Sequence, residues 1–188
     1  MTLGNTTLVE HGIHTEKSDL RAHVCVNARR VYVFPSSMAA DLIETNGQKY
    51  KRAPAFTTIN GSSLRTAEGY IIPWRDIPYI REVNATSVIE HIIKTSGFGE
   101  NESTSEKGNK AVAVVARLLQ IGHFPLPMDP LIVRDVDMQR EGDDIIVQSR
   151  HRIEVKCDFR GGGTWQRGSN VTGNLFLQVA ECNPLRMY

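Results

Sequence analysis

Apolar residues in the second half of the chain recur first at helical and then at alternating spacing. The helical stretch follows Ser103 and Glu106, which match an S-x-x-E capping box, and it stops at Gly122. This pattern predicts a helix over residues 106–121. Its apolar positions are Ala111, Val112, Val114, Val115, Leu118 and Leu119.

Four short segments after this helix are apolar and rich in β-branched residues, which is typical of strands. They are residues 131–136, 144–148, 152–157 and 174–179. A run of three glycines lies between the last two segments, and such a run does not form a stable strand or helix. The second half is therefore predicted to run helix, strand, strand, strand, loop, strand.

The first half mixes both kinds of pattern. The expected elements are strands at 22–27 and 31–34, a helix at 36–46, a strand at 69–74 and a helix at 87–94. Pro73 places the third strand at a sheet edge, because proline cannot donate to a ladder. Ser87 and Glu90 match a capping box for the second helix.

A polar segment at residues 96–109, rich in Gly, Ser, Glu and Asn, has few side chains to bury. It predicts a linker or an exposed loop between two halves. We therefore expect an N-terminal α/β region over residues 1–100, whose role the sequence does not indicate, and a second unit over residues 101–188. The expected fold class is α+β.

Composition narrows the classes of protein. The chain has 188 residues, and its 22 Lys and Arg balance 21 Asp and Glu to a net charge of +1. This near-neutral charge excludes a globally basic surface. The chain has 40% hydrophobic and 23% charged residues, which excludes a disordered chain. No apolar run approaches the roughly 20 residues of a membrane helix. The first ten residues lack a basic start and an apolar core, and the 3 cysteines are too few for a disulfide framework, so a cytoplasmic protein is expected.

The segment 152–157 carries the pattern most suggestive of chemistry. Side chains alternate along a strand, so Glu154 and Lys156 project from one face while Ile153 and Val155 project from the other. A turn near residues 149–151 would pair this strand with the one before it. The end of the preceding strand that carries Asp143 and Asp144 would then lie alongside Glu154.

Two carboxylates at a sheet margin suit a hard divalent ion such as Mg²⁺, which prefers oxygen ligands. A neighbouring lysine can hold the attacking water and offset charge on a phosphate. Phosphodiester hydrolysis needs these functions together. The alternative is a plain half-exposed strand, because 21 acids and 7 lysines give roughly 0.8 chance matches to E-x-K.

With these segments in order, the sequence resembles the PD-(D/E)XK nuclease superfamily, which has the restriction-endonuclease-like fold. The matching residues are 142–147 (GDDIIV) and 153–156 (IEVK), preceded by the capped helix, and the resemblance covers about residues 103–182. It implies a core of mixed sheet flanked by helices, with the first half as an N-terminal α/β extension.

The resemblance also assigns roles. Asp144, Glu154 and the carbonyl of Val155 would bind the metal, Mg²⁺ or alternatively Mn²⁺, and Lys156 would be the catalytic lysine. Asp143 competes with Asp144 as the first acid. The implied activity is metal-dependent endonucleolytic cleavage of DNA. A catalytically inactive nucleic-acid-binding or structural protein of the same fold is the alternative.

Three further positions are candidates for the same site. Many members of the superfamily carry a helix acid near the metal, where Glu106 lies, although Glu106 is also placed to cap its helix. Asp158 follows Lys156 by two residues and would face the same side. Gln178 follows a Gly-Asn-apolar run similar to a strand that carries a polar residue near the metal in some members.

The glycine-rich segment at residues 160–170 carries Arg160, Trp165 and Arg167. Arginine pairs with phosphate and tryptophan stacks on bases, so this loop is a candidate nucleic-acid contact. A mobile surface loop without a partner is the alternative. Members of the superfamily usually place a helix here, so the first half, a partner subunit in a homodimer, or a compact variant of the fold must supply the missing cover.

Overall fold

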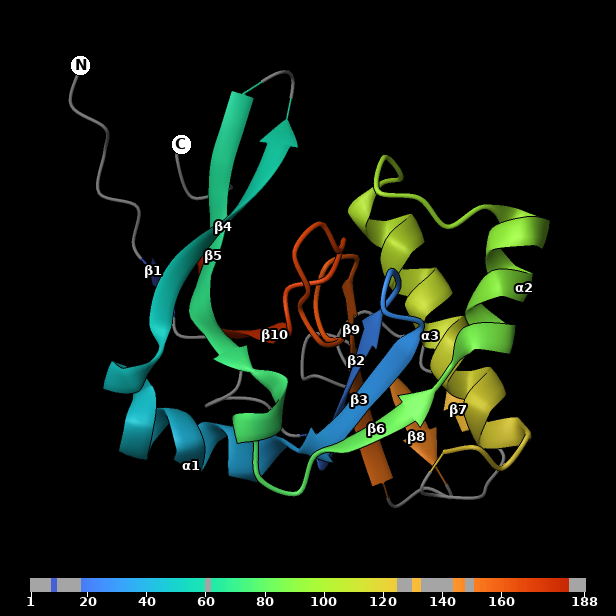
Figure 1. The fold of residues 1–188 in the computed structure, drawn as a ribbon, viewed down its shortest axis with the longest axis horizontal. Helices are drawn as coiled ribbons and strands as arrows, with labels where there is room; N and C mark the ends of the chain where they lie inside the picture. The colour runs from blue at the N-terminus through green and yellow to red at the C-terminus, as the bar shows by residue number, and fades with distance from the viewer. Residues whose placement is uncertain are drawn as a thin grey trace.

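Two β-sheets and three helices make up the described part of the chain (Figure 1). The structure is a computed structural model, and it describes residues 8–9, 18–59, 62–124, 130–132, 144–147 and 151–182. The helices are α1 (Ser36–Asn46), α2 (Thr86–Ser96) and α3 (Thr104–Gln120). The fold class is α+β, as predicted. None of the helices in these ranges is long and apolar enough to cross a membrane.

Each sheet takes strands from both sides of residue 100. The six-stranded sheet has the order β6 (Arg81–Asn84), β3 (Arg30–Pro35), β2 (Leu20–Cys25), β9 (His151–Asp158), β8 (Ile145–Val147) and β7 (Pro130–Ile132). The four-stranded sheet has the order β1 (Leu8–Val9), β10 (Asn174–Cys182), β5 (Ser62–Pro73) and β4 (Lys51–Ile59). The predicted boundary near residue 100 therefore does not separate two sheets. Strands from the first half lie beside the second.

Strand β9 joins the two halves at the centre of the larger sheet. It runs antiparallel to β8 and parallel to β2, with Leu20 opposite Ile153 and Ala22 opposite Val155. A parallel pair has to be joined by a long connection, and here the connection is more than a hundred residues of chain. The first half thus supplies the strand that lies parallel to β9.

One face of the six-stranded sheet is apolar, and α2 and α3 cover it (Figure 1). We call it the helix-covered face. Its core residues from the strands are Ala22, Val24, Val31, Val33, Val83, Ile145, Val147, Ile153 and Val155. Helix α3 adds an apolar stripe and begins with the predicted capping box, in which Ser103 and Glu106 bond reciprocally.

The opposite face mixes polar and aromatic residues, and we call it the polar face. Tyr32 and Phe34 on β3 pack there in a second core with Ile72 of β5 and Leu175 and Leu177 of β10. The four-stranded sheet thus covers part of the polar face. The other polar-face residues of the central strands are Arg21, His23, Glu154 and Lys156, which follow from the register of β2 with β3 and β9.

Two local predictions in the first half are wrong. Strand β5 lies between β10 and β4, so it is not an edge strand, and Pro73 is its last residue. Helix α2 begins at Thr86, and Ser87 lies inside it. The Thr86 N–H is bonded to the Asn84 side chain at 3.0 Å, so Asn84 rather than Ser87 stabilises this helix start.

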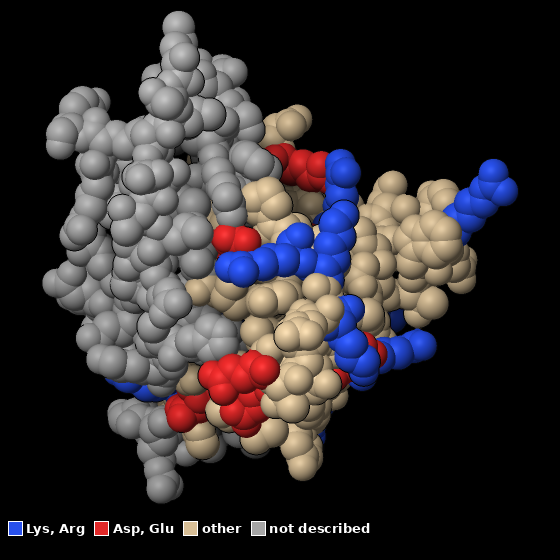
Figure 2. Space-filling model, turned by 90° about the vertical axis from the view of Figure 1, so that its left-hand side faces the viewer, with Lys and Arg blue, Asp and Glu red and all other residues tan. Residues whose placement is uncertain are grey.

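Charged side chains of both signs occupy the face that carries α1 and β4 (Figure 2). Lys and Arg gather near its centre, and Asp and Glu lie above and below them. Arg52 of β4 is ion-paired with Glu68 at 2.5 Å and lies over the ring of Tyr70. The part of this face that the structure describes is therefore not uniformly basic.

Candidate functional site

The hairpin of β8 and β9 places Asp144 beside Glu154. Ile145 pairs with Ile153 and Val147 with His151, as the sequence predicted for these two strands. The Asp144 N–H donates to the Ile153 carbonyl at 3.1 Å, a bond outside the regular antiparallel pattern, and the negative charge of Glu154 acts directly on the Asp144 carboxyl, so the two side chains lie close together. The two acids therefore sit on the polar face of neighbouring strands.

Asp144 is held by the backbone of the opposite strand. Its Oδ2 accepts the N–H of Val155 at 2.7 Å. The N–H and C=O of one strand residue point to the same side, so the Val155 carbonyl also faces the Asp144 side of β9. Burial, and next the negative charge of Glu154, raise the pKa of Asp144 to about 7. The folded protein thus destabilises the charged form of the Asp144 carboxyl group.

Glu154 and Lys156 form an ion pair on the polar face of β9. Glu154 is only 7% exposed, and its Oε2 is buried with no hydrogen-bond partner among the described residues. The side chain of Lys156 is 37% exposed, so the pair lies at the boundary between the interior and solvent. An unsatisfied carboxylate oxygen is rare in a protein interior, where polar atoms are normally paired.

Two residues of β2 complete the surroundings, and sequence reasoning missed them. Arg21 lies opposite Glu154 and His23 opposite Lys156 in the parallel register, and each is 1% exposed. Burial, followed by the charges of Arg21 and Lys156, holds the pKa of His23 well below its usual range. Its imidazole is therefore neutral, and its Nε2 has no hydrogen-bond partner in the described part of the chain.

A sequence signal for these two residues existed. In β2, Arg21 and His23 alternate with Ala22 and Val24, which is the same polar-apolar alternation that drew attention to Glu154 and Lys156. Only the parallel pairing of β2 with β9 brings the two alternations together. That pairing is not encoded locally.

Asp158 lies on the predicted face but serves the loop. Its Oδ1 accepts the N–H groups of Arg160 and Gly161, both at 2.8 Å. This arrangement turns the chain at the end of β9. Asp158 is thus occupied in shaping the start of the glycine-rich loop.

Glu106 does not join the site. Its Oε2 accepts the Ser103 N–H at 2.9 Å and the Ser103 hydroxyl at 2.6 Å, and these bonds lower its pKa. Helix α3 covers the opposite face of the sheet from Glu154. The side chain of Glu106 is committed to the cap, which is the alternative that the sequence offered for this residue.

Gln178 lies on β10 in the other sheet, paired with Gly69. Leu175, Leu177 and Val179 of the same strand face the second core, so alternation turns Gln178 to the opposite side. The structure therefore does not bring Gln178 to the Asp144–Glu154 pair.

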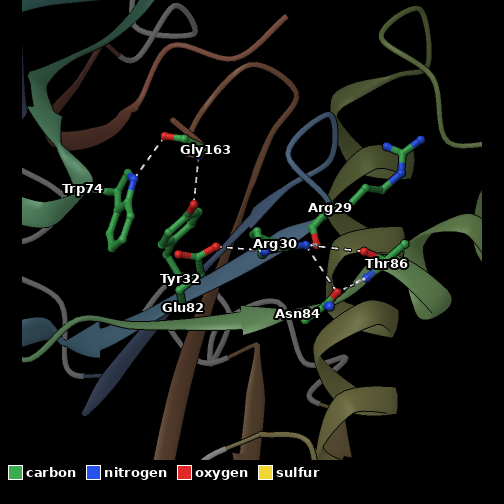
Figure 3. A network of polar contacts seen from close by, with 8 residues as sticks. All are labelled: Arg29, Arg30, Tyr32, Trp74, Glu82, Asn84, Thr86 and Gly163. Atoms are coloured by element: carbon green, nitrogen blue, oxygen red, sulfur yellow. Dashed lines mark hydrogen bonds and ion pairs between the residues drawn. The ribbon is translucent and has the colours of Figure 1, made fainter. Parts of the chain in front are cut away.

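Backbone contacts fix the glycine-rich loop to β3 and to Trp74 (Figure 3). The Gly163 N–H donates to the Tyr32 hydroxyl at 2.8 Å, and Trp74 Nε1 donates to the Gly163 carbonyl at 3.1 Å. A Cβ on Gly162 would lie 2.3 Å from the Tyr32 ring, and its φ of +66° also favours glycine. The start of the loop is thus fixed by these contacts. Trp165, two residues after Gly163, is 62% exposed.

The donor set for a metal is small in the ranges that the structure describes. They contain no group of three or more His, Cys, Asp and Glu side chains arranged to hold a metal ion. The competing acid Asp143 falls outside these ranges. Cys25 and Cys157 are free thiols whose pKa burial raises, that of Cys157 to about 12, so neither supplies a thiolate readily.

Comparison of the chain with protein-family models, with curated proteins and with solved structures finds no match.

Proposed function

We propose that this chain is a metal-dependent nuclease that hydrolyses phosphodiester bonds in DNA. The observation that carries the proposal is the placement of Asp144 beside Glu154 across the β8–β9 hairpin, with Lys156 paired to Glu154. The same three residues carry the resemblance to the PD-(D/E)XK nucleases.

The charge arrangement supports a divalent cation. Two carboxylates lie together in a largely buried place, where burial and the charge of Glu154 raise the pKa of Asp144, and Lys156 is ion-paired with Glu154. A cation between them would offset the repulsion and would satisfy the unpartnered Oε2 of Glu154. The oxygen donors, which are two carboxylates and the Val155 carbonyl, suit Mg²⁺ or Mn²⁺.

Each residue would have a distinct part in hydrolysis. Asp144 and Glu154 would hold the cation, which supplies Lewis-acid polarisation of the phosphodiester and of the attacking water. Lys156, partly exposed and close to Glu154, can donate hydrogen bonds to a phosphate oxygen or orient the water. Arg21 adds a buried positive charge on the neighbouring strand, which favours an anionic substrate at this face.

The proposed partner is DNA, and the proposed location is the cytoplasm. The glycine-rich loop continues directly from the strand that carries Glu154 and Lys156, and it presents Arg160, Trp165 and Arg167. The side chain of Arg160 is 72% exposed, and the ion pair that it makes with Glu100 is long, at 3.4 Å. Such an exposed pair is weak, so Arg160 can exchange Glu100 for a phosphate.

A cleavage assay tests this proposal. The purified chain is incubated with plasmid, single-stranded and branched DNA in EDTA, Mg²⁺ or Mn²⁺. We expect products only with metal, and loss of at least 100-fold in rate (order of magnitude) for Asp144→Asn, Glu154→Gln and Lys156→Ala. Glu106→Gln is the matched control, because glutamine preserves the capping box on the other face of the sheet.

One observation favours the second candidate, an inactive nucleic-acid-binding protein. Lys156 is engaged with Glu154, and this ion pair competes with any cation for the same carboxylate. Binding of DNA by the wild-type chain without cleavage under any metal condition would select the second candidate and reject the first.

A further inference from the structure

A pocket opens between the glycine-rich loop and the outer strands of the six-stranded sheet. Its volume is about 500 Å³, and it is open to solvent on one side. Arg30 and Glu82 line it from β3 and β6, and Thr164, Ser169 and Asn170 line it from the loop. Ala28 and Val171 are the apolar side chains of the lining and are outnumbered by these polar ones, so the pocket is suited to a polar ligand rather than to an apolar one.

Arg30 is fixed in place but retains donors for a ligand (Figure 3). Its Nε donates to Glu82 Oε1 at 2.9 Å. The acceptors of its Nη1 are the Arg29 carbonyl at 3.0 Å, Asn84 Oδ1 at 3.3 Å and Thr86 Oγ1 at 3.4 Å. Guanidinium has five N–H donors, and the two on Nη2 have no partner among the described residues.

Glu82 places an acceptor next to this donor. Its Oε1 is bonded to Arg30, and its side chain is 37% exposed, so carboxylate lone pairs remain open to the pocket. Adjacent donors and acceptors also line the edge of a nucleobase, which carries amino or imino N–H groups next to ring nitrogens and carbonyls. The Arg30–Glu82 pair is thus complementary to the edge of an unpaired base.

An exposed aromatic residue, Trp165, follows the loop wall of the pocket in the sequence. Gly163 and Thr164 line the pocket, and Trp165 follows them directly. Trp165 is one of the few large apolar residues exposed in the described ranges, at 62%. Because Tyr32 and Trp74 hold the Gly163 backbone, the chain that leads to Trp165 is fixed at the pocket wall.

We propose that this pocket and Trp165 together bind an unpaired nucleotide of single-stranded DNA. The base edge meets Arg30 and Glu82, and Trp165 stacks on an adjacent base. In a duplex the base faces are covered by neighbouring pairs, so an exposed ring of this kind finds its surface only on unpaired bases. The inference rests on the proposed function and specifies its substrate as single-stranded or branched DNA.

The test measures binding without cleavage. The chain carrying Lys156→Ala is titrated in EDTA against a short labelled single strand and against the duplex of the same sequence, by fluorescence anisotropy at constant ionic strength. We expect tighter binding of the single strand. Trp165→Ala should weaken that binding about 5- to 150-fold, the factor that one stacked base contributes, and Trp165→Phe should retain most of it.

Tyr79→Ala is the matched control. Tyr79 is an aromatic residue that is 79% exposed and does not line the pocket, so its removal should leave the affinity unchanged. Arg30→Lys should also weaken single-strand binding, because lysine keeps the charge but loses the fixed fork of donors. Circular dichroism of each variant identifies any that fails to fold.

Equal affinity for single strand and duplex would overturn the inference, and so would full affinity in Trp165→Ala. These outcomes are separate from the fate of the proposed function. Metal-dependent cleavage by the wild-type chain with no dependence on Trp165 rejects the inference alone. Trp165-dependent binding of single strands with no cleavage rejects the nuclease alone.

Discussion

Val155 donates its backbone N–H to Oδ2 of Asp144 at 2.7 Å, across the β8–β9 hairpin. This bond fixes the carboxyl group of Asp144 on the side of β9 to which the Val155 carbonyl also points. It favours the charged form of Asp144, yet burial and Glu154 raise the pKa more strongly. The pair is therefore held together by the backbone against its own electrostatic repulsion.

The free energy of unfolding of the metal-free chain should depend on pH through Asp144. Its folded pKa of about 7 exceeds its ordinary value of 3.8, so between these values the folded state binds a proton that the unfolded state has released. Stability from this group is therefore present at low pH and is lost as pH rises through about 7. Asp144→Asn should remove this loss and be more stable than wild type at pH above about 7.

Urea unfolding in EDTA across this pH range measures the effect. The quantity to compare is the difference in the free energy of unfolding between wild type and Asp144→Asn. His23 is present in both proteins and makes this free energy change with pH in the opposite direction, so its contribution cancels in the difference. The pKa of His23 is lowered on folding, so its protonation destabilises the fold as pH falls. A difference that does not change with pH would contradict the assignment of Asp144.

Removal of Lys156 should cost stability as well as activity. From the sequence alone, Lys156→Ala is expected to abolish cleavage with little loss of stability, as for an outward strand lysine. In the structure, Glu154 is 7% exposed and is ion-paired with Lys156. We therefore expect a loss of about 1–2 kcal/mol, reduced from the cost of a fully buried pair because Lys156 is partly exposed.

A double-mutant cycle separates this loss from misfolding. In Glu154→Gln the buried charge is absent, so adding Lys156→Ala to it should cost little further stability. Denaturant midpoints of the four proteins give the coupling energy. Equal losses in both backgrounds would mean that the ion pair contributes nothing.

Local patterns predicted the parts of the fold whose contacts are close in sequence. The capped helix α3, the helix α1 and the β8–β9 hairpin all follow from spacing over fewer than twenty residues. The alternation that separates Glu154 and Lys156 from Ile153 and Val155 is also local. The predicted alternation is confirmed, because Ile153 and Val155 are buried on the helix-covered face.

The remaining features depend on contacts between distant segments. Nothing near Arg21 indicates that β2 runs parallel to β9, so neither Arg21 nor His23 could be assigned to the site. The β4–β5 hairpin was missed because Pro54 and several polar residues obscure β4, and its pairing is what places β5 inside a sheet. The sequence shows the alternation of apolar and polar residues in β10. It does not show which face of β10 packs against the larger sheet.

The helix cap should contribute to stability and not to catalysis. Ser103→Ala removes the hydroxyl that accepts the Glu106 N–H at 3.2 Å, and should lower the free energy of unfolding by about 1 kcal/mol. The cleavage rate per folded molecule should stay unchanged, because α3 covers the other face of the sheet. A large change in the cleavage rate of Ser103→Ala at saturating metal would indicate that the helix start, including Glu106, contributes to the site.

Gly162→Ala should destabilise the fold and disturb the loop that carries Trp165. The new Cβ would lie 2.3 Å from the Tyr32 ring, which is fully buried and cannot move aside. The backbone φ of +66° adds strain, so we expect a loss of about 2–4 kcal/mol.

Gly168→Ala is the matched control: its φ is +84°, but a Cβ there meets nothing within 4 Å, so only the strain of about 1–2 kcal/mol remains. Thermal unfolding of both variants measures the difference between them, which reports the steric contact alone. Equal losses in the two variants would mean that the loop does not pack against Tyr32.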